Sequence, residues 1–198
     1  MFITFEGVDG SGKSTQARLL AERLRSEGRD VVATREPGGT NLGERIRDLV
    51  LHGGRVTPWA EASLFAAARA QLVDDVIRPA RERGADVVCD RYIDSSLAYQ
   101  GIARGLGVDR VLELNMIATG GVLPDRTFLL VLPLDEAALR RGPSGDRLEG
   151  EGAEFAGRVD RAYRELAGRF ARRVVTVDAT RSSDEIAEEI RGELRDLS

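Results

Sequence analysis

A glycine-rich segment near the amino terminus most constrains how this chain can fold. An apolar run at residues 2–5 leads into the pattern Gly7-x-x-x-x-Gly12-Lys13-Ser14, and a helical pattern follows. The glycines, with Gly10, allow several backbone N–H groups to turn towards one anion, and the helix directs its positive dipole end at the same point. The segment therefore predicts a Walker A phosphate-binding loop between a strand and a helix.

The basic residues support this interpretation. Lys13 is the only lysine among 29 lysine and arginine residues, so lysine is retained where a compact charge suits the β and γ phosphates. We expect Ser14 to ligate Mg²⁺ and the loop to hold the phosphates of ATP. The expected nucleotide-binding residues of the loop are Gly7, Val8, Asp9, Gly10, Ser11, Gly12, Lys13, Ser14 and Thr15.

Composition limits the class of protein. With 198 residues the chain fits one domain, residues 1–198, and its net charge of −4 with interspersed arginines gives no broad basic face for nucleic acid. The single cysteine, Cys89, excludes an internal disulfide and suits a reducing compartment, where we expect it to be a small buried residue. No leader pattern and no apolar run of about 18 residues is present, so we expect a cytoplasmic protein without a membrane span.

Strand and helix patterns alternate along the chain. This alternation predicts an α/β fold, a P-loop three-layer sandwich with a five-stranded parallel sheet and helices on both faces. A capping box at Ser182-x-x-Glu185 starts the last helix. The expected strands are residues 2–5, 30–34, 85–90, 128–132 and 173–177, and the expected helices before the capping box are 14–27, 42–51, 60–83, 108–118 and 154–172.

Chemistry-bearing residues follow several of these strands. Glu36 and Pro37 lie directly after the second strand, and Asp90 ends the third, where a P-loop protein places a carboxylate that holds Mg²⁺ through water. Phe65 and Arg69 are four residues apart and share a helix face. Each also has an ordinary interpretation, since Phe65 suits a core aromatic residue and Asp90 a solvated strand end.

Residues 140–153 differ in composition from the rest of the chain. This segment is rich in glycine and charge, with one large apolar residue, and it cannot pack a core. We interpret it as a short mobile lid or a surface loop. A lid carrying arginines such as Arg141 and Arg147 suits the cover of a transferring phosphoryl group.

Three motifs resemble one family. The segments T-R-E-P-G-G-T at 34–40, L-F-A-A-A-R at 64–69 and D-R-Y-I-D-S-S-L-A-Y-Q-G at 90–101 are similar to the signatures of the thymidylate kinases, within the P-loop nucleoside monophosphate kinases. The resemblance extends over essentially the whole chain. It implies transfer of phosphate from Mg-ATP to dTMP, giving dTDP for dTTP biosynthesis, by a homodimer.

The resemblance also implies residue roles. Phe65 would stack on thymine, Arg69 would hydrogen-bond its carbonyl edge, and Pro37 would follow a cis peptide. The adenine of ATP would lie near the lid and Ala179. The implied catalytic residues are Asp9, Lys13, Asp90, Arg91 and Arg147, and the implied dTMP-binding residues are Asp9, Glu36, Pro37, Arg47, Phe65, Arg69, Arg91, Ser95, Ser96, Tyr99 and Gln100.

One position departs from part of the family. Some members carry an arginine in the loop where this chain has Gly10, so the transition-state arginine is expected from the lid, as in the bacterial branch. Arg147 is the first choice, and Arg141, also assigned to the nucleotide, is the next.

Two alternatives stay open. One is a P-loop kinase that acts on another nucleotide or on a nucleoside. A nucleoside acceptor is the less favoured of these, because Arg47 and Arg91 suit an acceptor that carries a phosphate. The other is a non-catalytic nucleotide-binding switch. The Asn-Lys-x-Asp guanine motif of GTPase switches is excluded, since Lys13 is the only lysine.

Overall fold

A computed structural model describes residues 1–142 and 146–195 of the chain. Residues 143–145, within the predicted lid, lie outside the described residues. In the described part no helix has the length and apolar character needed to cross a bilayer.

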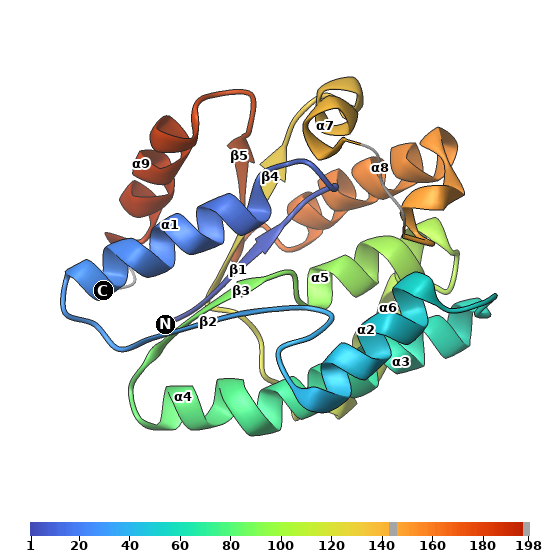
Figure 1. Cartoon of the computed structure of the whole chain (residues 1–198), viewed down its shortest axis with the longest axis horizontal. Coiled ribbons are helices and arrows are strands. Elements are labelled where there is room, and N and C mark those ends of the chain that lie inside the picture. The colour runs from blue at the N-terminus through green and yellow to red at the C-terminus, as the bar shows by residue number, and fades with distance from the viewer. Residues whose placement is uncertain (143–145, 196–198) are drawn as a thin grey trace.

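A five-stranded sheet forms the centre of the molecule (Figure 1), with all neighbouring strands parallel and the order β2-β3-β1-β4-β5. In β1, Thr4 is in register with Cys89 on one side and Thr127 on the other. All five residues of β1 are buried, as its apolar sequence predicts. The strands are β1 Phe2–Glu6, β2 Val31–Arg35, β3 Asp86–Asp90, β4 Arg126–Val131 and β5 Val174–Asp178.

Helices cover both faces of the sheet. Helices α1 and α9 pack together on one face, and α4, α5 and α8 lie on the other (Figure 1). The predicted three-layer α/β sandwich is therefore confirmed. The helices are α1 Lys13–Ser26, α2 Asn41–His52, α3 Pro58–Leu72, α4 Arg78–Glu82, α5 Ile93–Ser96, α6 Val108–Thr119, α7 Leu134–Arg141, α8 Ala153–Arg169 and α9 Ser183–Glu193, with π-helical turns at Val73–Ile77 and Leu97–Ala103 and a 3₁₀ turn at Glu149–Glu151.

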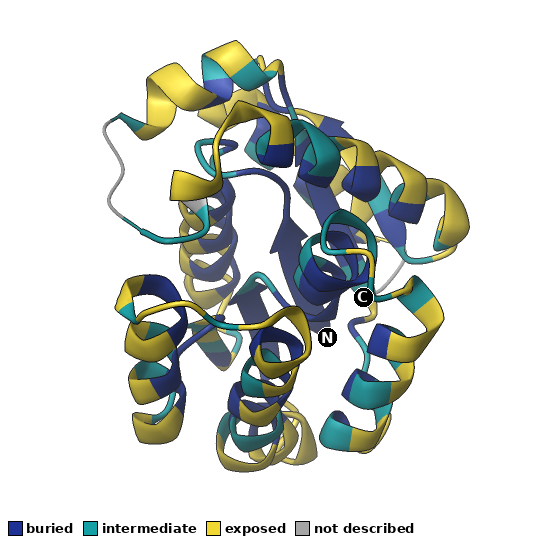
Figure 2. Cartoon of the chain, turned by 90° about the vertical axis from the view of Figure 1, so that its right-hand side faces the viewer, coloured by how far each residue is buried: buried dark blue, intermediate teal, exposed yellow. Residues whose placement is uncertain are grey.

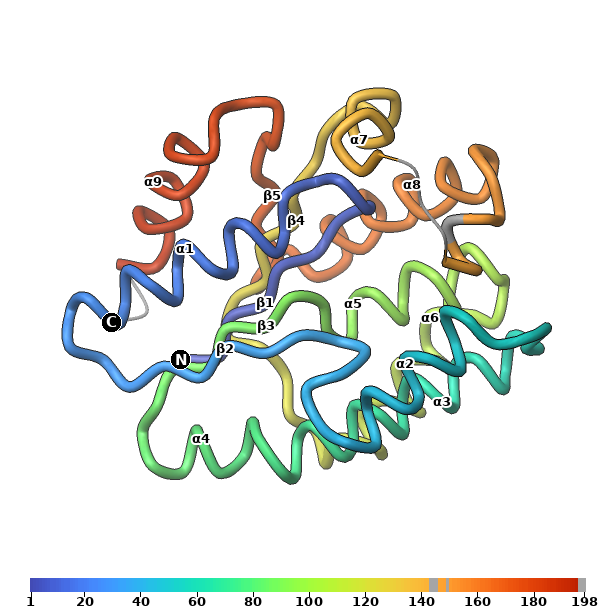
Figure 3. The backbone as a smooth tube through the Cα atoms, viewed as in Figure 1, coloured from blue at the N-terminus to red at the C-terminus, as the bar shows by residue number. Residues whose placement is uncertain are grey.

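The helical segments around α3, α4 and α7, which Figure 3 traces along the backbone, differ from the sequence prediction. The single helix expected at 60–83 is α3 and α4 joined by a π-helical turn at Val73–Ile77. The turn lies immediately before Pro79, which lacks an N–H, and a wider turn accommodates that missing donor. Helix α7, which supplies Arg140 and Arg141 at its end, was not predicted.

The core lies between the sheet and both helix layers (Figure 2). Phe5 of β1 and Phe128 of β4 contact each other there, with ring centroids 5.7 Å apart. Because β1 leads through α1 to β2, while β4 lies on the other side of β1, the chain reverses direction across the sheet at the carboxyl end of β1. Such a switch point leaves a crevice for a ligand, and the glycine-rich loop begins there.

Candidate active site

The glycine-rich loop connects β1 to α1 with three glycines at positive φ. Gly7, Gly10 and Gly12 have φ of 137°, 88° and 93°, a region that other residues rarely adopt. A Cβ on Gly10 would lie 2.1 Å from the carbonyl oxygen of Ala137 in α7. No side chain fits at position 10, which agrees with the expectation that a catalytic arginine must come from elsewhere.

Lys13 is the first residue of α1 and is almost wholly buried, with 6% of its surface exposed. Its Nζ donates to the carbonyl oxygen of Val8 at 2.9 Å and lies 3.5 Å from Asp9 Oδ1. Burial, reinforced by the nearby charge of Arg91, lowers the pKa of Lys13 to about 8. A buried ammonium with few protein partners is a ready partner for an anionic phosphate.

This lowered pKa predicts proton uptake when a nucleotide binds. At pH 8.5 Lys13 is mostly neutral in the free protein, and bound phosphates raise its pKa, so binding should take up about half a proton or more. Calorimetry of ADP binding in two buffers of different ionisation enthalpy measures this uptake. The Lys13→Met variant should take up none, and equal uptake by both proteins would contradict the assignment.

Ser14 and Asp90 meet opposite the loop, at the ends of α1 and β3. Ser14 Oγ donates to Asp90 Oδ2, and Asp90 Oδ1 is buried without a hydrogen-bond partner in the described structure. Within the described residues no cluster of three or more histidine, cysteine, aspartate or glutamate side chains could form an all-protein metal site. A hydroxyl and one orphaned carboxylate oxygen nevertheless fit Mg²⁺, which keeps most of its water and takes phosphate oxygens as ligands.

A polar pocket opens around the loop. Its wall includes the predicted residues from Asp9 to Thr15, together with Asp90 and Arg91. Four predicted nucleotide-binding residues, Gly7, Val8, Arg141 and Ala179, do not line it. Three arginines that were not predicted do line it, namely Arg35, Arg140 and Arg181.

A second pocket adjoins the first. Every residue that the resemblance assigned to dTMP lines it, and three others, Leu51, Asp146 and Leu148, complete the wall. The assigned residues come from the loop, α2, α3 and the α5 region, so the fold brings together segments far apart in the sequence. The full assigned set is Asp9, Glu36, Pro37, Arg47, Phe65, Arg69, Arg91, Ser95, Ser96, Tyr99 and Gln100.

Arg69 lies in the wall of this second pocket and is 1% exposed. Its guanidinium donates to Glu36 Oε2 at 2.8 and 2.5 Å, to Ser96 Oγ at 3.0 Å, to the Tyr92 carbonyl at 2.9 Å and to Asn115 Oδ1. All five guanidinium N–H groups thus have protein partners. A base contact by Arg69 therefore requires one of these hydrogen bonds to be shared.

Glu36 supplies the counter-charge for Arg69. Burial raises the pKa of Glu36 to about 7, against the opposing effect of the arginine. Its second oxygen, Oε1, is buried without a partner in the described structure, and Glu36 lines the second pocket. The peptide bond between Glu36 and Pro37 is cis, as the resemblance implied.

Arg91 joins the two pockets, since it lines both together with Asp9, Glu36 and Arg47. Its Nη2 lies 2.5 Å from Asp9 Oδ1 and its Nη1 donates to Tyr163 Oη at 2.9 Å. Burial disfavours ionised Asp9, but Arg91 and Lys13 overcome this and hold its pKa well below the usual range. Arg91 has φ of 70°, an uncommon value for a residue with a side chain, and such strain is concentrated at functional sites.

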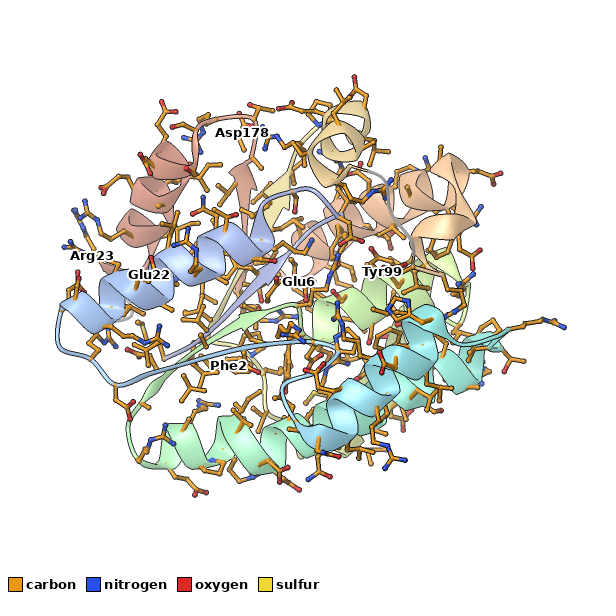
Figure 4. All side chains as sticks on the ribbon, viewed as in Figure 1. Phe2, Glu6, Glu22, Arg23, Tyr99 and Asp178 are labelled. Atoms are coloured by element: carbon orange, nitrogen blue, oxygen red, sulfur yellow. The ribbon has the colours of Figure 1, made fainter. Side chains whose placement is uncertain are left out.

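Tyr99 lies at the boundary of the same region. The Arg91 guanidinium carbon is 5.6 Å from its ring centroid, and its ring packs edge-on against Phe155 and Tyr163. Figure 4 shows Tyr99 and Glu6 in the interior, whereas Glu22 and Arg23 project from the outer face of α1. Tyr99 thus places an aromatic ring beside the guanidinium group of Arg91.

Arg147 is not at the loop in this structure. Its Nη2 donates to Glu61 Oε2 at 2.6 Å and its Nε to the Val50 carbonyl at 2.9 Å. Arg140, at the end of α7, instead lines the loop pocket and donates to the Ala179 carbonyl at 2.8 Å. Adjacent positions on a helix point about 100° apart, so Arg140 faces the loop while Arg141 lines a different pocket with Phe155.

Comparisons with known proteins agree with this geometry. A family model described as "Thymidylate kinase" matches residues 5–190. The chain belongs to the thymidylate kinase family. Proteins named thymidylate kinase from Leifsonia xyli subsp. xyli and Synechococcus sp. (strain JA-3-3Ab) are 53% and 51% identical to it, over 96% of this chain and 92% and 93% of theirs.

A solved structure gives the same result. The crystal structure of thymidylate kinase from Ehrlichia chaffeensis has a TM-score of 0.81 and 34% identity, covering 98% of each chain. The predicted thymidylate kinase family, the kinase activity that it implies and the P-loop fold are confirmed. The roles of individual site residues stay predictions.

Among the site residues that were not predicted, Glu61 and Arg140 escaped for different reasons. Glu61 is buried behind the second pocket, and its spacing of four from Phe65 places it on the same helix face, a signal that was available. Arg140 was missed because α7 was not predicted, and without helical phase nothing distinguishes it from Arg141.

Proposed function

We infer that this protein transfers the γ-phosphoryl group of ATP to dTMP, giving ADP and dTDP for dTTP synthesis. Family membership supports the reaction, and one observation supports the assignment of the two pockets. The loop pocket and the pocket around Phe65 share a wall that contains Arg47 and Arg91. Two phosphate groups bound in these pockets would meet at that wall.

The residues of the two pockets have separate roles in the proposed reaction. The acceptor phosphate is already an anion near pH 7, so no general base is required. We propose that Lys13 and the loop N–H groups hold the donor phosphates, and that Arg47 and Arg91 hold the acceptor phosphate. Asp9 orients Arg91 through its ion pair and approaches the sugar 3′-hydroxyl. These fixed charges align the reacting groups and stabilise the loose transition state.

The second pocket, around Phe65, carries side chains that match a thymine base. We propose that Phe65 stacks on thymine and that Gln100 contacts the ring edge. Because Ser96 Oγ accepts a hydrogen bond from Arg69, the Ser96 hydroxyl hydrogen is free to be donated to a carbonyl of the base. Glu36, Pro37, Ser95 and Tyr99 shape the sugar and phosphate region. Because one methyl group is worth about 1–3 kcal/mol, dUMP should be a weaker substrate rather than an excluded one.

We propose Mg²⁺ as the metal, held by Ser14 and, through water, by Asp90. The orphaned Asp90 Oδ1 beside the Ser14 hydroxyl supports this assignment. When bound, the ion supplies charge neutralisation between the phosphates. Asp90→Asn should raise the Mg²⁺ concentration needed for half-maximal activity, measured by titrating Mg²⁺ in the kinase assay, without unfolding the protein.

We propose Arg147 as the arginine that stabilises the transferring phosphoryl group, which requires its side chain to leave Glu61 during catalysis. Arg147→Ala should then lower kcat by about 10³-fold, by loss of transition-state charge stabilisation. Steady-state kinetics of Arg140→Ala and Arg141→Ala provide matched comparisons. A full kcat for Arg147→Ala with a large loss for Arg140→Ala would transfer the role to Arg140, which already lines the loop pocket.

A coupled assay of ADP release tests the function as a whole. With Mg-ATP, dTMP should turn over fastest, dUMP more slowly, and dCMP, dGMP, AMP and a blank without acceptor hardly at all. Preference for another nucleotide would keep the fold and replace the substrate. Turnover independent of acceptor would indicate an ATPase or a switch.

Two further properties are proposed from family membership. We propose a cytoplasmic homodimer whose interface uses the outer faces of α3 and α6, since Ile117 on α6 is 76% exposed. Sedimentation equilibrium of wild type and Ile117→Asp measures the assembly. A monomeric wild type would contradict the proposal.

A further inference from the structure

Glu61, in the first turn of α3, is a carboxylate with no exposed surface. Three donors converge on it from other segments. Gln100 Nε2 donates to Oε1 at 2.8 Å, Arg147 Nη2 donates to Oε2 at 2.6 Å, and Arg104 reaches both oxygens at 3.3 Å. A buried charge is costly unless it is paired, and here two guanidinium groups compensate one carboxylate.

The Gln100 side chain is neutral and takes no part in this charge balance, but its contact with Glu61 fixes the direction of its amide. In every one of these hydrogen bonds Glu61 is the acceptor. Gln100 must turn its NH₂ group towards Glu61. This leaves the carbonyl oxygen, with the second N–H of Nε2, as the groups that Gln100, 1% exposed, can present to the pocket it lines.

We propose that Glu61 is a positioning residue that fixes the amide of Gln100 with its oxygen towards the base, so that the site selects pyrimidines carrying N–H at ring position 3 over cytosine. The proposal rests on the proposed function and deepens it. Thymine and uracil have a donor at that position, whereas cytosine has an acceptor. Two facing acceptors in a buried site leave both unsatisfied, a cost equivalent to about 5–150-fold in binding.

Glu61→Gln is the direct test, read as kcat/KM for dTMP, dUMP and dCMP. The new amide can donate or accept, so Gln100 loses its fixed orientation. The ratio of dTMP to dCMP should fall about tenfold or more, with dUMP following dTMP. The loss for dTMP should appear mainly in KM, because the base is remote from the transferring phosphoryl group.

Two controls separate positioning from general disturbance. Arg147→Met removes the cation that the proposed catalytic movement would withdraw in any case and leaves Arg104 and Gln100 on Glu61, so the substrate ratio should stay at the wild-type value even though kcat falls. In a Gln100→Ala background, Glu61→Gln should no longer change the ratio, since the effect passes through Gln100. An unchanged ratio in folded Glu61→Gln, or an equal fall in the Gln100→Ala background, overturns the proposal.

Nuclear magnetic resonance of the full-length protein tests the orientation of the Gln100 amide without an activity measurement. The Gln100 side-chain NH₂ signals, identified by their disappearance in Gln100→Ala, should exchange slowly with solvent because they are buried against Glu61. Rapid exchange overturns the proposal even if Glu61→Gln fails to fold. If wild type prefers an acceptor other than dTMP, the proposed function fails, while the exchange rate still decides the orientation of Gln100.

Discussion

Replacing Lys13 with methionine is expected to lower kcat by about 10²–10³-fold, the usual effect of removing one donor that stabilises developing charge. The protein should stay folded, because a buried ammonium whose pKa is lowered contributes no net stabilisation where it is charged. Steady-state kinetics with dTMP and thermal unfolding measure the two effects. Together they distinguish loss of chemistry from loss of structure.

The matched control is Arg18→Met, on the same helix. Arg18 is 59% exposed at its side chain and pairs with Glu22 on the outer face of α1, so its replacement should leave kcat unchanged. If Lys13→Met retained kcat within about threefold of wild type, the loop would not bind the donor phosphates in the way that phosphate loops do.

Arg69→Met is expected to reduce the free energy of unfolding by about 3–5 kcal/mol. The change leaves Glu36 as a buried carboxylate without its cation and removes donors from Ser96, Asn115 and the Tyr92 carbonyl. Urea unfolding, followed by circular dichroism, measures the loss. The same change should disorder the wall of the base pocket.

Two variants test the reason for this loss. Adding Glu36→Gln to Arg69→Met should restore part of the stability, since folding then no longer requires a buried carboxyl to take up a proton or stay charged without its cation. Arg78→Met, which removes an exposed ion pair with Asp74, should cost less than about 1 kcal/mol. A similar small cost for Arg69→Met would show that the buried ion pair is not a stabilising centre of the fold.

The sequence predicted the parts of the molecule that local patterns encode. The loop around Lys13 and the five strands follow from glycine spacing and apolar runs. The residues that line the second pocket were named from the resemblance to the family. Helix α7 was missed although Asp135 and Glu136 lie in its first turn and Arg140 and Arg141 in its last, an arrangement that suits the helix dipole. The glycine-rich sequence that follows led the end of this segment to be assigned to the lid.

Other features depend on contacts between distant segments. The five hydrogen bonds of Arg69 go to four residues, Glu36, Tyr92, Ser96 and Asn115, which lie 23 to 46 residues away in the sequence. The carboxylate that accepts from Arg147 is 86 residues away. No short pattern encodes such pairs. Sequence motifs therefore identified which residues gather at the site, whereas the structure was needed to learn which of their donors and acceptors are already engaged.

The close approach of α7 to the loop has a consequence for how such enzymes can diverge. With the Ala137 carbonyl 2.1 Å from the place a Cβ on residue 10 would occupy, an arginine cannot be moved from the lid into the loop by a single substitution. The backbone of α7 would first have to shift, so the two arrangements of the catalytic arginine are separated by a structural intermediate. Loop-arginine variants of this chain should accordingly arise only alongside changes in or before Leu134–Arg141.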